Sequence, residues 1–234
     1  MKASIILATY KEKENITKLI KALLEACKKA KITPEIIVVD DNSPDGTAKA
    51  VEKEYSKNKK VKIIVRKNER GLATAIRRGI EESKEDILVF MDTDFSHNPN
   101  LVPKLIKLTK DKDIVSGSRY VKGGDLQTDL HRNIITILEQ LYVRFMIGYN
   151  ITDYTLGFLA IRKSLLNKLN LDKIFYGYGD YCIRLFHYTS KKKNTKILEI
   201  PATYKIREEG ESKTNIIKHS FQYFFEVLKL RFNS

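Results

Sequence analysis

Two aspartates separated by one residue, Asp92 and Asp94, are the strongest chemical signal in the sequence. They follow the apolar run ILVFM, which is typical of a buried strand. Alternate residues of an extended segment point the same way, so both carboxylates can hold a hard divalent cation and leave coordination positions open for phosphate oxygens. For this pair alone, a turn whose aspartates cap the next helix is the alternative interpretation.

A second acidic pair, Asp40 and Asp41, follows another apolar run and precedes the turn sequence NSPDG. A carboxylate at this place can accept hydrogen bonds from the N–H groups of a nucleobase, and we assign that role to Asp41. For Asp40 a structural hydrogen-bonding role stays equally open. Asp45 and Gly46 are expected to form the turn and the helix cap.

These acidic groups need a scaffold that brings strand ends together, and the apolar periodicity predicts one. The predicted strands are Ala3–Ala8, Glu35–Val39, Val61–Val65, Asp86–Met91, Asp113–Ser116, Gly157–Arg162 and Ile197–Ile200. The predicted helices are one through Ile16–Cys27, one from Thr47, then Leu72–Ser83, Pro99–Thr109, His131–Tyr149, Tyr181–Thr189 and a terminal helix from about Thr214. This alternation predicts an α/β fold with a mostly parallel sheet, helices on both faces, and ligands beyond the carboxyl ends of the strands. With no linker or repeat in between, we expect a single domain over residues 1–234.

The composition narrows the class of protein. The 234 residues are 42% hydrophobic, which is typical of a globular chain with a substantial core. The net charge of +14 favours an anionic partner such as a membrane surface, nucleic acid or a phosphorylated substrate. No run approaches the roughly 18 apolar residues of a membrane span, and we expect a cytoplasmic protein with Cys27 and Cys182 as buried free thiols.

Six segments extend the chemical signal over almost the whole chain. In order, they are ATYKEKENI, IIVVDDNSPDGT, GLATAIRRG, MDTDFSHNP, GSRYVKGG and REEGESKTN. Together they resemble the polyprenyl- and dolichyl-phosphate sugar synthases among the family 2 inverting glycosyltransferases, from residue 3 to about residue 215. The resemblance implies a GT-A (Rossmann-like) fold, a divalent metal (Mg2+ or Mn2+) and a nucleotide-sugar donor.

The resemblance also implies an activity. A hexose would be transferred from a nucleotide-sugar, with GDP-mannose the favoured donor, to a polyprenyl or dolichyl phosphate. The reaction would take place on the cytoplasmic face of a membrane. A separate membrane-embedded protein is a possible partner there, and nucleic acid is not expected as a partner. Residues 1–118 would bind the nucleotide-sugar, and residues 119–234 would bind the acceptor. Three alternatives stay open: a UDP-glucose-dependent enzyme, a transferase of the same fold that uses a soluble glycan acceptor, and a non-catalytic basic binding module.

Individual roles carry over from the family's motifs. The expected donor-binding residues are Ala8, Tyr10, Glu12, Val39, Asp41, Asp92, Thr93, Asp94, Arg119, Arg207 and Lys213. The acceptor phosphate is expected at Arg119, Arg132, Thr136 and Arg207, and the metal at Asp94 and Ser96. Asp92, Asp94 and Arg207 form the expected catalytic set. The planar guanidinium group of arginine can donate two hydrogen bonds to phosphate oxygens at once, whereas the ammonium group of lysine is a mobile point charge.

Three positions depart from the family pattern. Ala8 stands where Pro is common, Ser96 where many relatives have a metal-contacting Gln, and Ile183 where many have a carboxylate. Asp180 is the candidate substitute for that missing carboxylate. The histidines lack the spacing of metal ligands and are expected to be structural or exposed, with His97 packed in its loop.

Two helical segments combine apolar and basic side chains. The terminal helix places Ile217, Phe221, Phe224 and Leu228 on one face beside several cations, as a helix in a lipid headgroup region does. Packing on the protein's own core or on another subunit is the alternative. The same two interpretations apply to His131–Tyr149.

Overall fold

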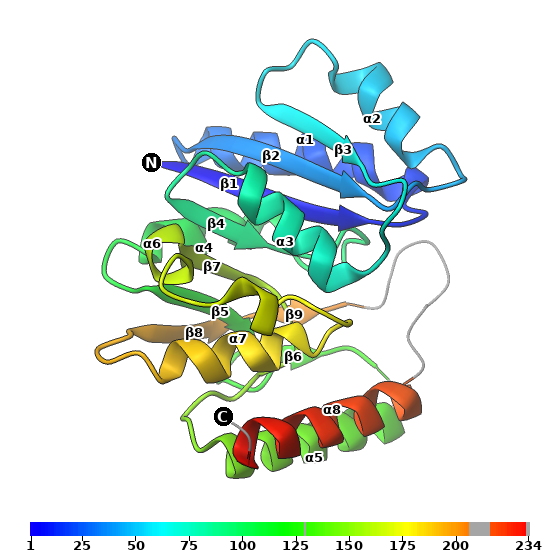
Figure 1. Ribbon diagram of the computed structural model, residues 1–234. Coiled ribbons are helices and arrows are strands. Elements are labelled where there is room, and N and C mark those ends of the chain that lie inside the picture. Colours follow the sequence, from blue (N-terminus) through cyan, green and yellow to red (C-terminus); the bar gives the residue numbers. More distant parts are fainter. Residues whose placement is uncertain (129, 206–215, 233–234) are drawn as a thin grey trace.

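The computed structural model describes residues 1–128, 130–205 and 216–232. Its main sheet has seven strands in the order β3-β2-β1-β4-β7-β5-β8 (Figure 1). The strands are β1 (Lys2–Thr9), β2 (Thr33–Asp40), β3 (Val61–Val65), β4 (Ile87–Phe90), β5 (Ile114–Ser118), β7 (Leu159–Arg162) and β8 (Ile197–Pro201). All neighbours pair in parallel except β7, which runs antiparallel to both β4 and β5. The expected mostly parallel sheet is confirmed.

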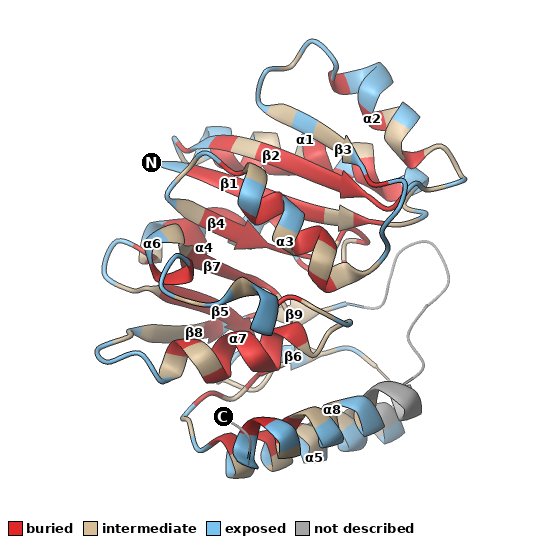
Figure 2. Cartoon of the chain, in the orientation of Figure 1, coloured by how far each residue is buried: buried red, intermediate tan, exposed pale blue. Residues whose placement is uncertain are grey.

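Helices cover both faces of this sheet, which explains why its central strands are apolar along nearly their whole length. The helices are α1 (Lys13–Lys29), α2 (Thr47–Tyr55), α3 (Leu72–Glu82), α4 (Val102–Leu108), α5 (Leu130–Ile147), α6 (Lys163–Leu166), α7 (Tyr181–Ser190) and α8 (Ile216–Phe232), with 3-10 turns η1 (Pro99–Leu101) and η2 (Leu171–Lys173). One apolar core joins α1, α2 and α4 to one face, and a second joins α3, α7 and the inner sides of α5 and α8 to the other. Figure 2 shows the sheet buried between these layers.

Helices α5 and α8 lie side by side at one end of the molecule, beyond the edge of the sheet (Figure 1). Tyr142 of α5 stacks on Phe224 of α8, with ring centroids 5.0 Å apart. Val143 of α5 and Val227 of α8 are fully buried on the inner sides of the two helices. Ten large apolar side chains of the described parts of these two helices are exposed, namely Ile134, Ile135, Ile137, Leu138, Leu141, Phe145, Phe221, Phe224, Phe225 and Phe232. Both helices therefore pack on the core and also present an apolar surface, so neither of the two sequence interpretations excludes the other.

The sequence missed the shortest elements. The strands β6 (Asp125–Leu126) and β9 (Thr203–Tyr204) pair with each other in a separate two-stranded sheet. Two residues are too few to show a periodic pattern, which explains the omission. Cys27 and Cys182 are buried free thiols, as predicted. In the described part of the chain, no helix is both long enough and apolar enough to span a bilayer.

Candidate active site

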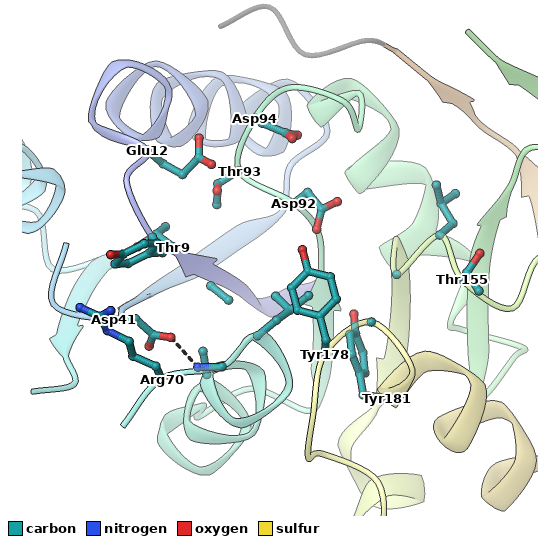
Figure 3. Close-up of a pocket in the computed structure, with 18 of the residues that line it drawn as sticks. Thr9, Glu12, Asp41, Arg70, Asp92, Thr93, Asp94, Thr155, Tyr178 and Tyr181 are labelled. Carbon is teal, nitrogen blue, oxygen red and sulfur yellow. Dashed lines mark hydrogen bonds between the residues drawn. The ribbon is translucent and has the colours of Figure 1, made fainter. Parts of the chain in front are cut away.

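A cavity of about 380 Å³ opens at the carboxyl ends of the parallel strands, where the topology predicts a ligand site. Asp41 and Arg70 lie at one end of it, Thr155 lies at the other, and Asp92 lies between them (Figure 3). Its lining combines acidic, basic and aromatic side chains. These residues are Ala8, Thr9, Tyr10, Glu12, Asp41, Arg70, Gly71, Leu72, Ala75, Asp92, Thr93, Asp94, Arg119, Thr155, Leu156, Gly157, Tyr178, Gly179, Tyr181, Tyr204 and Tyr223.

The turn after β4 holds the two central aspartates. Asp94 is only 2% exposed, and its Oδ1 accepts hydrogen bonds from the backbone N–H and the hydroxyl of Ser96, at 3.1 and 2.5 Å. Asp92 is more open, with 42% of its side chain exposed. Phe95 adopts a left-handed φ of 61°, which an L-residue rarely occupies and which turns the chain sharply behind the aspartates. The turn therefore presents Asp92 to the cavity and anchors Asp94 more deeply.

His97 braces this turn from within the protein. Its Nδ1 accepts a hydrogen bond from the backbone N–H of Asp92 at 3.0 Å, and its ring stacks on Phe158 at 4.8 Å between centroids. Burial lowers the pKa of His97 to about 4, so the ring is neutral at pH 7 with its proton on Nε2. The prediction that His97 packs in its loop is confirmed.

The donor set fits a cation that keeps open coordination positions. In the described ranges, no three side chains of His, Cys, Asp or Glu gather as a metal cage. Mg2+ is usually bound through one or two carboxylates together with substrate phosphates and water, and Asp92 and Asp94 match that pattern. Ser96 lies behind Asp94 and donates its hydroxyl to that carboxylate, so in this structure it orients the aspartate.

The two carboxylates after β2 have different surroundings. Asp40 is fully buried and accepts hydrogen bonds from the Thr9 hydroxyl at 3.0 Å and from the Ser43 backbone at 2.9 Å, so its role is structural. Asp41 lines the cavity. Asp45 accepts from the Thr47 backbone and Gly46 has a φ of 87°, which confirms the expected turn and cap.

Arg119, directly after β5, is held by a partner that the sequence did not reveal. Its Nε and Nη2 each donate to the carboxylate of Asp153 at 2.7 Å, and its backbone N–H donates to the same group at 3.1 Å. Burial lowers the pKa of Arg119, but the Asp153 carboxylate more than reverses this, so the net shift is upward. Glu199 of β8 fixes the loop in turn by accepting from the backbone N–H groups of Thr152 and Asp153. Arg119 is therefore a permanently charged group with one preset orientation at the cavity wall.

The structure brings many of the expected site residues together. Ala8, Tyr10, Glu12, Asp41, Asp92, Thr93, Asp94 and Arg119 all line the one cavity. Of the other described candidates, Val39, Ser96 and Thr136 are not part of the lining, and Val39 packs into the core beside Ala75. The side chain of Arg132, and both Arg207 and Lys213, lie outside the described residues.

Several lining residues were not anticipated. Thr155 and Gly157 reach the cavity because β7 is antiparallel, so its beginning, and not its end, lies at this edge of the sheet. Gly71 is the first residue of the segment GLATAIRRG, Arg70 precedes it directly, and the sequence predicted no role in the site for either residue. Tyr178, Tyr181 and Tyr223 add an aromatic wall from the α7 region and α8.

Asp180, the candidate substitute for the missing family carboxylate, is engaged by two donors in this structure. Its side chain accepts from the Arg184 guanidinium at 2.7 Å and from the Tyr178 backbone N–H at 2.9 Å. Arg184 is fully buried, so Asp180 compensates its charge and stabilises the Tyr176–Asp180 loop. Asp180 is also absent from the lining among the described residues. The substitution of Asp180 for the family carboxylate stays a prediction.

Known proteins share both the sequence pattern and the fold. The chain is 36% identical to a dolichol-phosphate mannosyltransferase of Pyrococcus furiosus, over 98% of this chain and 64% of that protein, so it spans somewhat less than two thirds of that relative. It is 34% identical to an undecaprenyl-phosphate mannosyltransferase of Micrococcus luteus, over 91% of this chain and 87% of that protein. A glucosyl-3-phosphoglycerate synthase of Mycobacterium tuberculosis, solved with Mn2+, UDP and phosphoglyceric acid, shares the fold with a TM-score of 0.72 and 17% identity, over 98% of this chain and 78% of that one. Residues 4–170 match the model of glycosyl transferase family 2. The chain belongs to glycosyl transferase family 2.

Proposed function

We propose that this protein transfers one hexose, with GDP-mannose the favoured donor, to a polyprenyl or dolichyl phosphate at a membrane surface, with inversion at the sugar carbon. The names of the two relatives, a dolichol-phosphate and an undecaprenyl-phosphate mannosyltransferase, support mannose as the hexose and a lipid phosphate as the acceptor, because the similarity extends over nearly all of this chain. In the proposal the first half of the chain binds the donor and the second half, from residue 119, binds the acceptor.

One observation carries the proposal: the polar cavity adjoins the apolar surface of α5 and α8. Tyr223 of α8 lines the cavity, while Phe221 and Phe225 of the same helix are 63% and 64% exposed. A lipid-linked phosphate requires this combination, because its head must reach cations while its chain stays in an apolar phase. A soluble glycan acceptor is polar, so its binding does not require the ten exposed apolar side chains of α5 and α8.

The residues of the chain divide the chemistry between them. Asp41 binds the nucleobase, and Asp92 lies beside the donor diphosphate. Arg119, oriented by Asp153, contacts phosphate oxygens through Nη1, which has no acceptor among the described residues. Two anions repel each other, so the work of these groups is to hold donor and acceptor in line. Arg207, Lys213, Arg132 and Thr136 stay predicted phosphate ligands.

A bound Mg2+ or Mn2+ would stabilise the negative charge that develops on the leaving nucleoside diphosphate. Asp94 and Asp92 would hold it, with Ser96 as a predicted further contact. The acceptor needs no strong general base, because a phosphate monoester has a second pKa of about 6 and is mostly ionised at neutral pH. His97 fits this scheme, because its ring is neutral and its Nδ1 already accepts a hydrogen bond from the backbone N–H of Asp92.

The outer face of α5 and α8 is the proposed contact with the lipid headgroups, on the cytoplasmic side of the membrane. Lys229 and Arg231 lie on α8 beside this face, and the chain as a whole carries a net charge of +14. Cations of this kind strengthen binding to anionic lipids. A separate membrane-embedded protein that receives the product is a further proposed partner.

The decisive experiment offers the purified protein a panel of radiolabelled nucleotide-sugars with polyprenyl phosphate and Mg2+ or Mn2+, followed by organic extraction. We expect label in the organic phase from GDP-mannose, and none from the Asp94→Ala variant. Label from UDP-glucose instead would change the donor and keep the acceptor. Label only in a soluble glycan, or no transfer from any donor, would refute the proposed function.

A further inference from the structure

The carboxylate of Asp41 is held from behind by Arg66, which is not among the described residues that line the cavity. Arg66 Nε donates to Asp41 Oδ1 at 2.7 Å, and Arg66 Nη2 donates to the same oxygen. The backbone N–H of Gly71 donates to the other oxygen, Oδ2, at 2.8 Å (Figure 3). A carboxylate offers about four acceptor positions. The described residues therefore fill three of them and leave one, on Oδ2.

Arg66 has little freedom to turn away from this arrangement. It is 7% exposed, and its Nη1 donates to the Thr74 hydroxyl at 2.9 Å and to Glu69 at 3.3 Å. Its Nη2 also donates to the carbonyl of Gly71 at 3.0 Å, which links the end of β3 to the start of α3. All three guanidinium nitrogens are thus engaged, and the charge of Arg66 offsets that of Asp41. This pairing reduces the repulsion that an unpaired carboxylate would exert on a nearby diphosphate.

We infer that Arg66 restricts Asp41 to reading a single ring N–H, so that the donor site selects 6-oxopurine and 4-oxopyrimidine bases and does not read the 2-amino group of guanine. This inference rests on the proposed nucleotide-sugar donor. Arg66 acts through Asp41 and is a positioning residue for base recognition.

The chemistry of the bases explains the selection. Guanine, hypoxanthine and uracil each carry a ring N–H at the centre of the pairing edge, whereas adenine and cytosine carry a lone pair there. A lone pair that faces the carboxylate is repelled and leaves a buried acceptor unpaired. Guanine also carries a 2-amino group beside its N–H, but on Asp41 the acceptor positions that could pair with it are occupied by Arg66.

The test is calorimetric binding of GDP, IDP, UDP, ADP and CDP to the wild-type protein with Mg2+. We expect IDP to bind within about fivefold of GDP, and ADP and CDP to bind at least about tenfold more weakly than GDP and UDP, since a hydrogen bond to a charged group is lost. A larger gap between GDP and IDP overturns the inference, and so does a smaller gap for ADP or CDP. If none of the five binds, the nucleotide-sugar donor of the proposed function fails and the inference fails with it. If the nucleotides bind but their affinities do not follow the expected order, only the inference fails.

Arg66→Met separates positioning from simple stability. Removing the guanidinium frees two acceptor positions on Asp41, so we expect the 2-amino group to become readable and the ratio of GDP to IDP affinity to rise above about fivefold. An unchanged ratio would overturn the role of Arg66. Arg78→Met is the matched control, because Arg78 is an exposed arginine of α3 that pairs with Glu82 at 2.6 Å, and its ratio should equal the wild-type value. Should Arg66→Met not fold, the wild-type panel still decides the inference.

Discussion

Replacing Asp153 with Asn tests whether Arg119 depends on one buried partner for its position. Asp153 is fully buried and accepts five hydrogen bonds, three of them from Arg119 and the others from the backbone N–H groups of Thr155 and Leu156. Asparagine has nearly the same shape, but it lacks the charge and turns one acceptor oxygen into an NH2 donor. That donor would face the N–H groups that Asp153 now satisfies.

The burial of the pair sets the expected magnitude. The side chain of Arg119 is 9% exposed, so Asp153→Asn leaves a buried charge without its partner, which costs about 3–5 kcal/mol of unfolding free energy. The control is Asp172→Asn, which breaks a surface pair with Arg77. The side chains of Asp172 and Arg77 are 74% and 33% exposed, and such surface pairs contribute about 0–1 kcal/mol to the unfolding free energy.

Urea unfolding of the three proteins at pH 7 measures both effects. We expect the midpoint of Asp153→Asn to fall by several times the shift of Asp172→Asn, with an unchanged dependence on urea concentration. Affinity for GDP should fall as well, because Arg119 loses its preset orientation. A loss of stability equal to that of the surface control would refute the claim that Asp153 positions Arg119.

Three further predictions concern the site, the membrane surface and pH. Asp94→Ala should lower the transfer rate at least about 100-fold in a protein that remains folded, because charge on the leaving group loses its counterion. Turnover near the wild-type rate would contradict the metal assignment. Replacing Phe145 and Phe225 with Ser should weaken binding to anionic vesicles at least about tenfold without altering GDP affinity, since both rings are more than 60% exposed. The control, Val65→Ser on β3, should leave vesicle binding unchanged. Burial raises the pKa of Glu139 to about 7, so the folded state holds this proton more tightly than the unfolded state, and stability from this group is lost as pH rises from about 4.5 to 7. Glu139→Gln should therefore stabilise the protein by about 1–3 kcal/mol at pH 8 and change little at pH 4.5, and an equal effect at both pH values would argue against the shifted pKa.

Much of the candidate site could be predicted because it lies at strand ends. The apolar runs before Asp41, Asp92 and Arg119 are local patterns, and parallel strands place their carboxyl ends at the same edge of the sheet. The helices α5 and α8 were visible for the same reason, since their apolar spacing is local. Local patterns also predicted the turn at Asp45 and Gly46.

The partners of those residues could not be predicted in this way. Asp153 lies 34 residues from Arg119, and Arg66 lies 25 residues from Asp41, in loops with no periodic pattern. The same holds for Asp180, because its position in the sequence did not reveal that its carboxylate would accept a hydrogen bond from Arg184.

The sequence by itself determined which side chains stand at the end of each strand, because alternation and helical spacing are encoded in neighbouring residues. Only the tertiary structure decided the direction of β7, the aromatic wall of Tyr178, Tyr181 and Tyr223, and the ion pairs that orient Arg119 and Asp41. The physical reason is that a hydrogen bond between distant loops depends on the path of the whole chain through space. Residue type and spacing can place a charge on the rim of the sheet, but they cannot say which other charge will face it.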